Sequence, residues 1–349
     1  MSAANQNPVK SALARIASGK HLEFTEASAV FEQIMSGQAS DAQIGALLMG
    51  FVMRQESPDE ISALVAVLRS HARTVTAPEG AMDIVGTGGD GAHTLNISTA
   101  TALIVAGCGV PVAKHGNKAF SSKSGAADIL AEIGVNLEAE IPLVEQAIKE
   151  AKIGFLMAPR YHSAMRFVGP ARTQMGIPTL FNLVGPMCNP ANVNSLLVGC
   201  YDPAKLVIMA ATLGRLGAEH CWVVHGSGGE NQGLDELSIS GPSRVCEYTR
   251  QGGIREFTVQ PEDAGCKRYP LHAIRGGTPA QNAQSLRRLL EGETGAYREI
   301  TIFNAAAALL ISKQCSDLHQ GAGRARQAID TGRAKAALEQ LCRLTNGQQ

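Results

Sequence analysis

From residue 82 onward, strand-like and helix-like segments alternate along the chain, and this alternation constrains the fold more than any other feature. Short apolar runs at MDIV (82–85), VPVAKHG (110–116), SLLVGCY (195–201) and CWVVHG (221–226) predict strands. Helical segments lie between them, as at NISTATALIVAG (96–107). Such alternation favours a mainly parallel sheet with helices on its faces. In sheets of this kind, the loops beyond the carboxyl ends of the strands form the binding crevice.

The rest of this region is interpreted in the same way. We expect helices at SGAADILAEIG (124–134) and around AKLVIMAATLGRLG (204–217), and a further strand at VNLE (135–138). Residues 236–260 indicate shorter strands that could pair antiparallel, and residues 279–345 indicate helices.

The first 72 residues have a different pattern. Residues 9–72 are expected to be helical, with a capping-box spacing at SDAQ (40–43) and a stronger one at SPDE (57–60). TVTAPEG (74–80) is typical of a linker, and 349 residues are enough for two domains. The predicted fold class is α/β, with a small all-helical domain plus a large α/β domain whose mainly parallel central sheet is flanked by helices.

Charge and composition exclude several classes of function. Lys+Arg and Asp+Glu both total 31, so the usual electrostatic case for a general nucleic-acid or membrane-surface binder is removed, although zero net charge does not exclude a local basic patch. The start, MSAANQNPVK, lacks the apolar run of a signal peptide, and no stretch approaches the ~20 apolar residues of a membrane span. Eight cysteines without a C-x-x-C pair predict reduced thiols and a cytoplasmic protein. We therefore expect no nucleic-acid partner and no membrane partner.

The stretch DIVGTGGDG (83–91) is a candidate phosphate-binding loop. Its glycines match the dinucleotide spacing G-x-G-x-x-G, but the next strand ends in Lys114 where that fingerprint needs an acidic residue. No Gly-Lys-Ser/Thr follows, so the loop is not a Walker motif either. Glycine amides and the following helix N-terminus still suit a sugar phosphate. Asp90 suits ribose hydroxyls or water around a metal ion. A tight turn without a ligand is the alternative that this loop alone leaves open.

Two further polar clusters point to the same chemistry. KHGNKAFSSKSG (114–125) combines lysines, glycines and serines after a strand, which indicates a second phosphate cradle or else a solvated loop. HGSGGENQGLDELS (225–238) contains Asp235 and Glu236, which could bind Mg²⁺ if they reach the same crevice, although adjacent carboxylates are usually just solvated. Two phosphate cradles and a carboxylate pair describe a site for a Mg-complexed pyrophosphoryl compound.

These motifs together resemble one family. DIVGTGGDG…NIST, KHGN…SSKSGAAD, APRYHSAM, FNLVGPMCNP and GLDELS occur in order over roughly residues 10–345. Any one of them is weak, but five in sequence are specific, and they resemble the anthranilate phosphoribosyltransferases, nucleoside phosphorylase-like enzymes of tryptophan biosynthesis. The resemblance implies Mg-dependent transfer of the phosphoribosyl group of phosphoribosyl pyrophosphate (PRPP) to the anthranilate amine, with release of pyrophosphate.

The resemblance also implies site residues. PRPP contacts are expected at Gly86, Gly89, Asp90, Thr94, Asn96, Ile97, Ser98, Thr99, Lys114, His115, Gly116, Asn117, Lys118, Ala119, Phe120, Ser121 and Ser122. Anthranilate contacts are expected at Gly86, Asn117, His162, Arg172 and Pro186, with His115 also lining the path. Arg172 offers a planar fork that suits a carboxylate. Metal contacts are expected at Ser98, Asp235 and Glu236, with two Mg²⁺ ions per subunit.

The family architecture implies domain bounds and partners. The small domain would comprise residues 1–75 and a returning segment near 158–182, and the large phosphoribosyl-binding domain residues 76–157 and 183–349. A homodimer is expected, with possible association with anthranilate synthase.

The chain departs from the family pattern in a few places. The family often has Arg where this chain has Lys118 and Pro178, GPMCNP replaces the more usual GPLTNP, and the loop at 227–233 is longer than usual. These departures bear on kinetics and acceptor affinity more than on the class of reaction.

The predicted chemistry is substitution at the anomeric carbon of the ribose. Mg²⁺ and Lys114 would neutralise the departing pyrophosphate, with Asp90 near the sugar and His115 a candidate for ordering the acceptor. An aromatic amine is already nucleophilic, so no general base is required. Two alternatives remain: a nucleoside phosphorylase, which would need no Mg-pyrophosphate clamp, and a nucleic-acid-binding relative that has lost catalysis, which zero net charge opposes.

Overall fold

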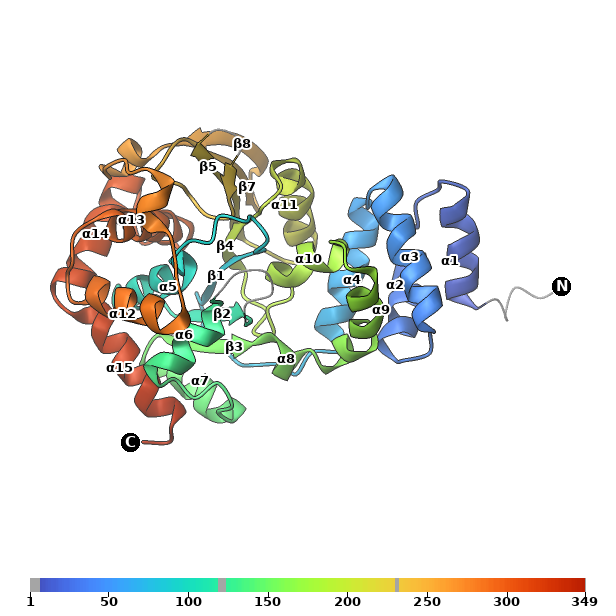
Figure 1. Ribbon diagram of the computed structural model, residues 1–349, viewed down its shortest axis with the longest axis horizontal. Helices are drawn as coiled ribbons and strands as arrows, with labels where there is room; N and C mark the ends of the chain where they lie inside the picture. The colour runs from blue at the N-terminus through green and yellow to red at the C-terminus, as the bar shows by residue number, and fades with distance from the viewer. Residues whose placement is uncertain (1–6, 119–123, 230–231, 349) are drawn as a thin grey trace. The chain divides into compact units, whose positions relative to one another are not determined.

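The computed structural model describes residues 7–118, 124–229 and 232–348, and the chain divides into two compact units (Figure 1). The helical unit comprises Met1–Thr74 and Pro159–Pro190, and the α/β unit comprises Val75–Ala158 and Ala191–Gln349. The returning segment thus ends at Pro190, whereas the sequence suggested an end near 182, because α10 in that segment packs against α4. None of the helices in the described part of the chain combines the length and apolarity needed to cross a bilayer.

The helical unit is built from short helices around an apolar centre that includes Phe31 and Phe51. Both capping boxes expected from the sequence are present, with Ser40 and Ser57 as N-caps, which is why α3 and α4 begin where they do. The elements are α1 (Pro8–Ala17), α2 (Phe24–Met35), α3 (Asp41–Arg54), α4 (Pro58–Ser70), α8 (Ala158–Tyr161), η2 (Ser163–Phe167), α9 (Gly169–Met175), α10 (Leu180–Val184) and η3 (Gly185–Met187).

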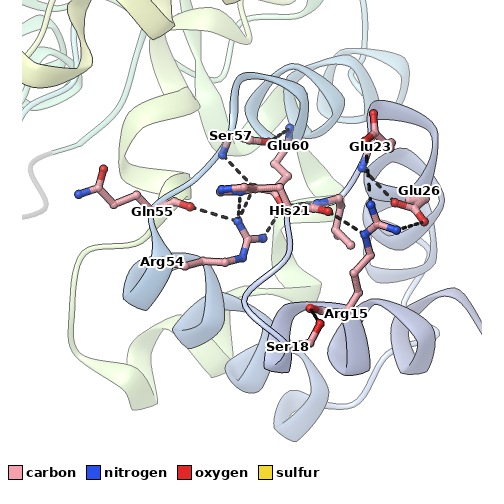
Figure 2. Close-up of polar contacts among 10 residues, drawn as sticks. Arg15, Ser18, His21, Glu23, Glu26, Arg54, Gln55, Ser57 and Glu60 are labelled. Atoms are coloured by element: carbon pink, nitrogen blue, oxygen red, sulfur yellow. Dashed lines mark hydrogen bonds and ion pairs between the residues drawn. The ribbon is translucent and has the colours of Figure 1, made fainter.

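One buried carboxylate fastens the start of α4 to the loop before α2. Figure 2 shows Arg54 and Ser57 converging on Glu60. Glu60 is fully buried and accepts hydrogen bonds from the backbone N–H groups of Leu22 and Ser57, both at 2.8 Å. Burial raises the pKa of Glu60, but these bonds and the ion pair with Arg54 outweigh that effect, so the pKa lies below its ordinary value. Glu60 is therefore held ionised as a structural anchor.

The α/β unit contains one sheet in the order β3-β2-β1-β4-β5-β7-β8, with β6 paired to β5. The first five strands along the chain are parallel, and β6, β7 and β8 are antiparallel additions at one side. The predicted, mainly parallel sheet is confirmed. Its strands are β1 (Met82–Gly86), β2 (Val112–Gly116), β3 (Ile153–Met157), β4 (Ser195–Gly199), β5 (His220–Gly229), β6 (Gln232–Leu234), β7 (Ser243–Thr249) and β8 (Gly253–Val259).

Helices cover both faces of this sheet. In Figure 1, α11 lies on one side of the strands, and α5 with the C-terminal helices lies on the other. Buried residues cover almost the whole of α5, because it packs between the sheet and helices α13, α14 and α15. The helices and short 3₁₀ turns are α5 (Ile97–Gly107), α6 (Ala126–Ile133), α7 (Ile141–Glu150), η4 (Pro203–Lys205), α11 (Leu206–Arg215), η5 (Pro261–Ala264), η6 (Leu271–Ile274), α12 (Pro279–Leu290), α13 (Ala296–Ile311), α14 (Leu318–Asp330) and α15 (Arg333–Thr345).

The expected strand at VNLE (135–138) is wrong. Val135 is buried, but the Asn136 side chain accepts a hydrogen bond from the Glu138 N–H at 3.0 Å and donates to the Thr345 carbonyl at 3.2 Å. This local Asx turn competes with an extended strand. The third strand of the sheet is instead β3, which follows α7.

Candidate active site

The glycine-rich loop after β1 lies against Asp235. Gly86 ends β1, and a Cβ at this position would overlap the Asp235 carboxylate. Gly88 has a φ of 68°, which other residues rarely adopt, and its N–H donates to Asp235 Oδ2 at 2.7 Å. The loop therefore presents a backbone amide to an anion, as the sequence predicts, but here the anion is a carboxylate of the chain itself.

Lys114 on β2 is the buried cation of this cluster. It is only 2% exposed, and its Nζ donates to the Ile84 carbonyl at 2.6 Å and to Ser98 Oγ at 3.3 Å. Burial lowers the pKa of Lys114, and the neighbouring carboxylates of Asp83, Glu236 and Asp235 oppose that effect. An ammonium has three N–H donors, so one remains for a bound oxygen.

Asp235 and Glu236 follow β6 and bring two acidic groups to the same place. Burial, together with the nearby Asp90 carboxylate, raises the pKa of Asp235 to about 7. Burial and Asp235 raise the pKa of Glu236 well above its ordinary value, against the opposing effects of Lys114 and the Ser98 N–H. A cation bound here would therefore stabilise the ionised form of both groups.

Asp90 links the glycine-rich loop to this acidic pair. Its Oδ1 accepts from the Ala92 N–H at 3.0 Å, which closes an Asx turn, and its Oδ2 lies 3.4 Å from the Asp235 N–H. The structure thus brings Gly86, Asp90, Lys114 and the acidic pair into one cluster, although they come from separate segments of the chain.

The predicted PRPP contacts at residues 94–99 lie at the start of α5 and just before it. Ile97 is buried, so its backbone is the part that can reach a ligand, and Ser98 borders Lys114 and Glu236. Asn96 does not cap the helix with its side chain; it donates to the Ser124 carbonyl at 3.1 Å instead. Thr99 Oγ1 is buried without a hydrogen-bond partner among the residues that the structure describes. Thr94 lies just before this helix and forms a β-bridge with Arg275.

These oxygen donors fit Mg²⁺. The Ser98 hydroxyl and the carboxylates of Asp235 and Glu236 are hard ligands, and Mg²⁺ is usually held by one or two carboxylates while substrate phosphates and water complete its shell. Within residues 7–118, 124–229 and 232–348, no group of three or more His, Cys, Asp and Glu side chains forms a complete metal site. Such a donor set can hold Mg²⁺ together with a phosphorylated substrate but is too small to hold the ion alone.

The second predicted phosphate loop is described only in part. Gly116 ends β2, and the exposed residues Asn117 and Lys118 follow it; Asn117 Oδ1 accepts from the Lys118 N–H at 2.8 Å. The predicted contacts Ala119, Phe120, Ser121 and Ser122 lie outside the described residues, as does part of the loop at 227–233. His115 is buried next to Lys114, and its N–H donates to Asp83 Oδ1 at 3.1 Å. Strand alternation directs these two neighbouring side chains to opposite faces of the sheet.

The predicted anthranilate residues of the helical unit lie in one segment of it. Arg172 on α9 has its guanidinium 5.3 Å from the centre of the Phe181 ring, and burial lowers its pKa. His162 is 6% exposed, and burial lowers its pKa, although hydrogen bonds with the backbones of Cys188 and Leu68 oppose this effect; burial thus favours the neutral ring. Pro186 is buried in η3, close in sequence to Cys188. Pro178 is exposed in the turn after α9.

Sequence reasoning missed the residues from the C-terminal helices that support the site. Asn304 on α13 is fully buried, accepts from the Leu237 N–H at 3.0 Å and donates to the Leu237 carbonyl at 2.9 Å. The Tyr297 hydroxyl donates to the Asn96 carbonyl at 3.1 Å, and Asn282 Nδ2 donates to Asn96 Oδ1 at 2.9 Å. The one available signal was a lone asparagine inside the apolar run IFNAAAALLI.

Comparisons with known proteins agree over nearly the whole chain. Residues 10–72 match the helical bundle domain of a glycosyl transferase family, and residues 78–335 match the a/b domain of that family. The anthranilate phosphoribosyltransferase of Paramagnetospirillum magneticum is 50% identical over 338 residues, which cover 97% of this chain and 96% of that protein.

Solved structures give the same result. The crystal structure of anthranilate phosphoribosyltransferase from Thermus thermophilus has a TM-score of 0.90 at 40% identity and covers 98% of this chain and 100% of its own. The Saccharomyces cerevisiae enzyme in complex with PRPP and Mg has a TM-score of 0.87 at 25% identity, with coverage of 98% and 99%.

Proposed function

The chain belongs to this glycosyl transferase family and carries out the anthranilate phosphoribosyltransferase reaction of tryptophan biosynthesis, and from that premise we propose which residues perform the transfer. The reaction joins the anthranilate nitrogen to the anomeric carbon of PRPP and breaks the bond from that carbon to pyrophosphate. The nitrogen loses a proton as the C–N bond forms. The observation that carries the proposal is the cluster of Lys114, Asp235 and Glu236 beside the glycine-rich loop.

We propose that PRPP binds across the loop 86–99 and the start of the loop after β2. The amides of the glycine-rich loop and the first turn of α5 would bind phosphate oxygens, and the third N–H of Lys114 would donate to the pyrophosphate. Asp90 would accept hydrogen bonds from the ribose hydroxyls. These interactions strengthen as negative charge collects on the leaving group, so they lower the barrier rather than only bind the substrate.

Use of Mg²⁺ is supported by the complex of the yeast relative with PRPP and Mg. We propose that Ser98, Asp235 and Glu236 hold it, and that two ions bind per subunit. When bound, Mg²⁺ neutralises charge on the pyrophosphate as it departs. The raised pKa values of the two carboxyl groups support this assignment, because an unpaired buried acidic pair is costly without a cation.

We propose that Arg172 binds the anthranilate carboxylate and that His162, Pro186, Asn117 and Gly86 line the acceptor's route. A planar guanidinium matches a carboxylate in a bidentate arrangement. The contact between the Arg172 guanidinium and the Phe181 ring restrains the Arg172 side chain, which supports this role. The neutral, buried ring of His162 suits contact with an aromatic acceptor rather than proton transfer.

The residue assignment is tested by following the loss of anthranilate fluorescence with PRPP. The double variant Asp235→Asn with Glu236→Gln should lose Mg-dependent turnover by about 100-fold or more while keeping its thermal unfolding transition. The matched control is Glu262→Gln with Asp263→Asn, an adjacent acidic pair on the surface in η5. Equal activity of the site variant and the control would refute the metal assignment.

A homodimer is also proposed, and exposed apolar side chains of the helical unit support it. Phe24 on α2 is 40% exposed, and Met49 and Met53 on α3 are 43% and 74% exposed one helical turn apart. Met49→Gln with Met53→Gln should shift the mass in sedimentation equilibrium towards the monomer. Ile254→Gln, on the α/β unit, should leave the dimer intact. A monomeric wild-type protein would contradict the proposal.

Two further proposals concern where the protein is located in the cell and which protein it associates with. A cytoplasmic location is supported by eight cysteines that are all free thiols. Association with anthranilate synthase follows from shared use of anthranilate, and co-purification of the two proteins tests it.

A further inference from the structure

A polar cleft lies in the C-terminal part of the α/β unit. It has a volume of about 250 Å³ and is formed by the segment around η6, the end of α12 and the start of α13. Its most polar lining residues are Arg275, Ser285, Arg288, Glu293, Thr294 and Arg298. Three arginines line this one cleft, so their charges must be balanced by acidic groups of the chain or by a bound anion.

The three arginines are unequally neutralised by the chain itself. Arg288 Nε pairs with Glu293 at 2.8 Å, and its Nη2 donates to Ser285 Oγ at 3.3 Å. Arg298, with a side chain only 9% exposed, pairs with Asp330 at 2.5 Å. The guanidinium of Arg275 has no hydrogen-bond or ion-pair partner within the described part of the chain. The cleft therefore carries one positive charge more than its acidic partners offset.

The start of α13 adds backbone donors to the same cleft. Ala296, Tyr297 and Arg298 form its first turn and line the cleft. The N–H groups of a first turn have no acceptor within their own helix. In a helix of 16 residues they also carry the positive end of the macrodipole. Guanidinium groups, hydroxyls and unpaired amides together are the donors that recognise a tetrahedral oxyanion.

This cleft is joined to the proposed PRPP loop by backbone pairing. Arg275 forms a β-bridge with Thr94, the Leu95 N–H donates to the Ile274 carbonyl at 2.8 Å, and the Gly276 N–H donates to the His93 carbonyl at 2.8 Å. Tyr297 lines the cleft and donates to the Asn96 carbonyl. An anion that fixes Arg275 and the start of α13 would therefore restrain residues 93–96 from two sides.

We infer that this cleft binds a phosphate group, either free or as part of a small ester. A phosphate bound there restrains the loop that is proposed to bind PRPP. The binding site does not depend on the residue roles proposed above, but its effect on PRPP affinity rests on them. The residues that line the cleft do not include Lys114, Asp235 or Glu236, so both sites can be filled at once.

Binding is tested by thermal unfolding of the full-length protein with inorganic phosphate, followed through Trp222 fluorescence. Saturating PRPP with Mg²⁺ but without anthranilate is present throughout, so that the substrate site is already filled, and KCl of equal ionic strength is the reference. Phosphate should raise the Tm by about 2 °C in the wild type. Arg288→Gln should abolish this rise, whereas Arg287→Gln, its exposed neighbour on α12, should retain it.

Each result of this experiment has one meaning. No rise in the wild type, or the same rise in Arg288→Gln, would overturn the phosphate site. A wild-type melt without PRPP is the second reference, and if PRPP with Mg²⁺ does not raise the Tm above that reference, the proposed substrate site fails instead.

Coupling to the loop is tested by turnover. Phosphate also competes with PRPP for the substrate site, and this effect is common to both proteins. The informative quantity is therefore a ratio: the KM for PRPP of Arg288→Gln divided by the KM for PRPP of the wild type, measured at each phosphate concentration. This ratio should grow at least twofold as phosphate rises, and a constant ratio would contradict the coupling. A free phosphate and a phosphate ester are distinguished by repeating the melts with ribose 5-phosphate.

Discussion

At the scale of the residue, the site places acidic side chains close together in a buried position. Their mutual repulsion destabilises the fold unless a cation binds between them. Asp235 accepts an amide hydrogen bond from Gly88, yet burial and Asp90 still raise its pKa to about 7. The ionised carboxylate thus weakens the metal-free fold, and the proposed cation would stabilise it. A binding site of this kind gives up some folding free energy in exchange for affinity.

The pH dependence of stability follows from this pKa. The folded pKa of Asp235 lies above its ordinary value of 3.8, so the folded protein binds more protons between these values and stability falls as the pH rises from about 4 to about 7. Without metal, Asp235→Asn should therefore be more stable than the wild type by about 4 kcal/mol at pH 8 and by less at pH 5. Urea unfolding monitored by Trp222, which is buried in the same unit, measures this. An unchanged or lower stability of the variant at pH 8 would contradict the assigned pKa.

Arg172 allows a sharp test of acceptor recognition. Arg172→Ala should raise the KM for anthranilate about 10- to 100-fold and change the KM for PRPP little, because a charge-assisted bidentate contact is lost. Arg166 is the matched control, since it also lies over a phenylalanine ring, 4.6 Å from the centre of Phe167, but is exposed. Steady-state kinetics that show equal effects for Arg166→Ala and Arg172→Ala would assign Arg172 a purely structural role.

At the scale of the element, α13 fixes the acidic pair in place. Asn304 bonds to both the N–H and the carbonyl of Leu237, the residue that follows Glu236, so the helix holds the backbone next to the two carboxylates. Local sequence patterns cannot predict this pairing, because 67 residues separate the two partners. The same limit explains why Tyr297 and Asn282 were missed, whereas the glycine-rich loop, Lys114 and the acidic pair each stand in a motif that local sequence shows.

Replacing Asn304 should therefore affect metal use as well as stability. Asn304→Leu would leave the Leu237 N–H and carbonyl unpaired in the core, which should cost about 2–4 kcal/mol and raise the Mg²⁺ concentration needed for half-maximal activity. Ser312→Ala, at the other end of α13, removes a hydrogen bond to Ala308 and should leave Mg²⁺ dependence unchanged. Loss of stability with an unaltered Mg²⁺ requirement would show that α13 does not position the pair.

At the scale of the whole molecule, the sequence predicts the architecture well where signals are periodic. Capping boxes at Ser40 and Ser57 locate helices of the helical unit, and alternation of strands and helices predicts the parallel sheet. The strand expected at 135–138 failed because the Asn136 turn overrides a short apolar run. The end of the returning segment at Pro190 depends on packing against α4, which no local pattern reports.

We propose that Asp235 and Glu236 bind the metal that accompanies PRPP. A crystal structure with PRPP and Mn²⁺ in place of Mg²⁺ tests it most directly, because anomalous scattering locates the ion. We predict a manganese peak within coordination distance of the Asp235 and Glu236 carboxylates and of pyrophosphate oxygens. Manganese bound to PRPP while both side chains remain uncoordinated would contradict the claim.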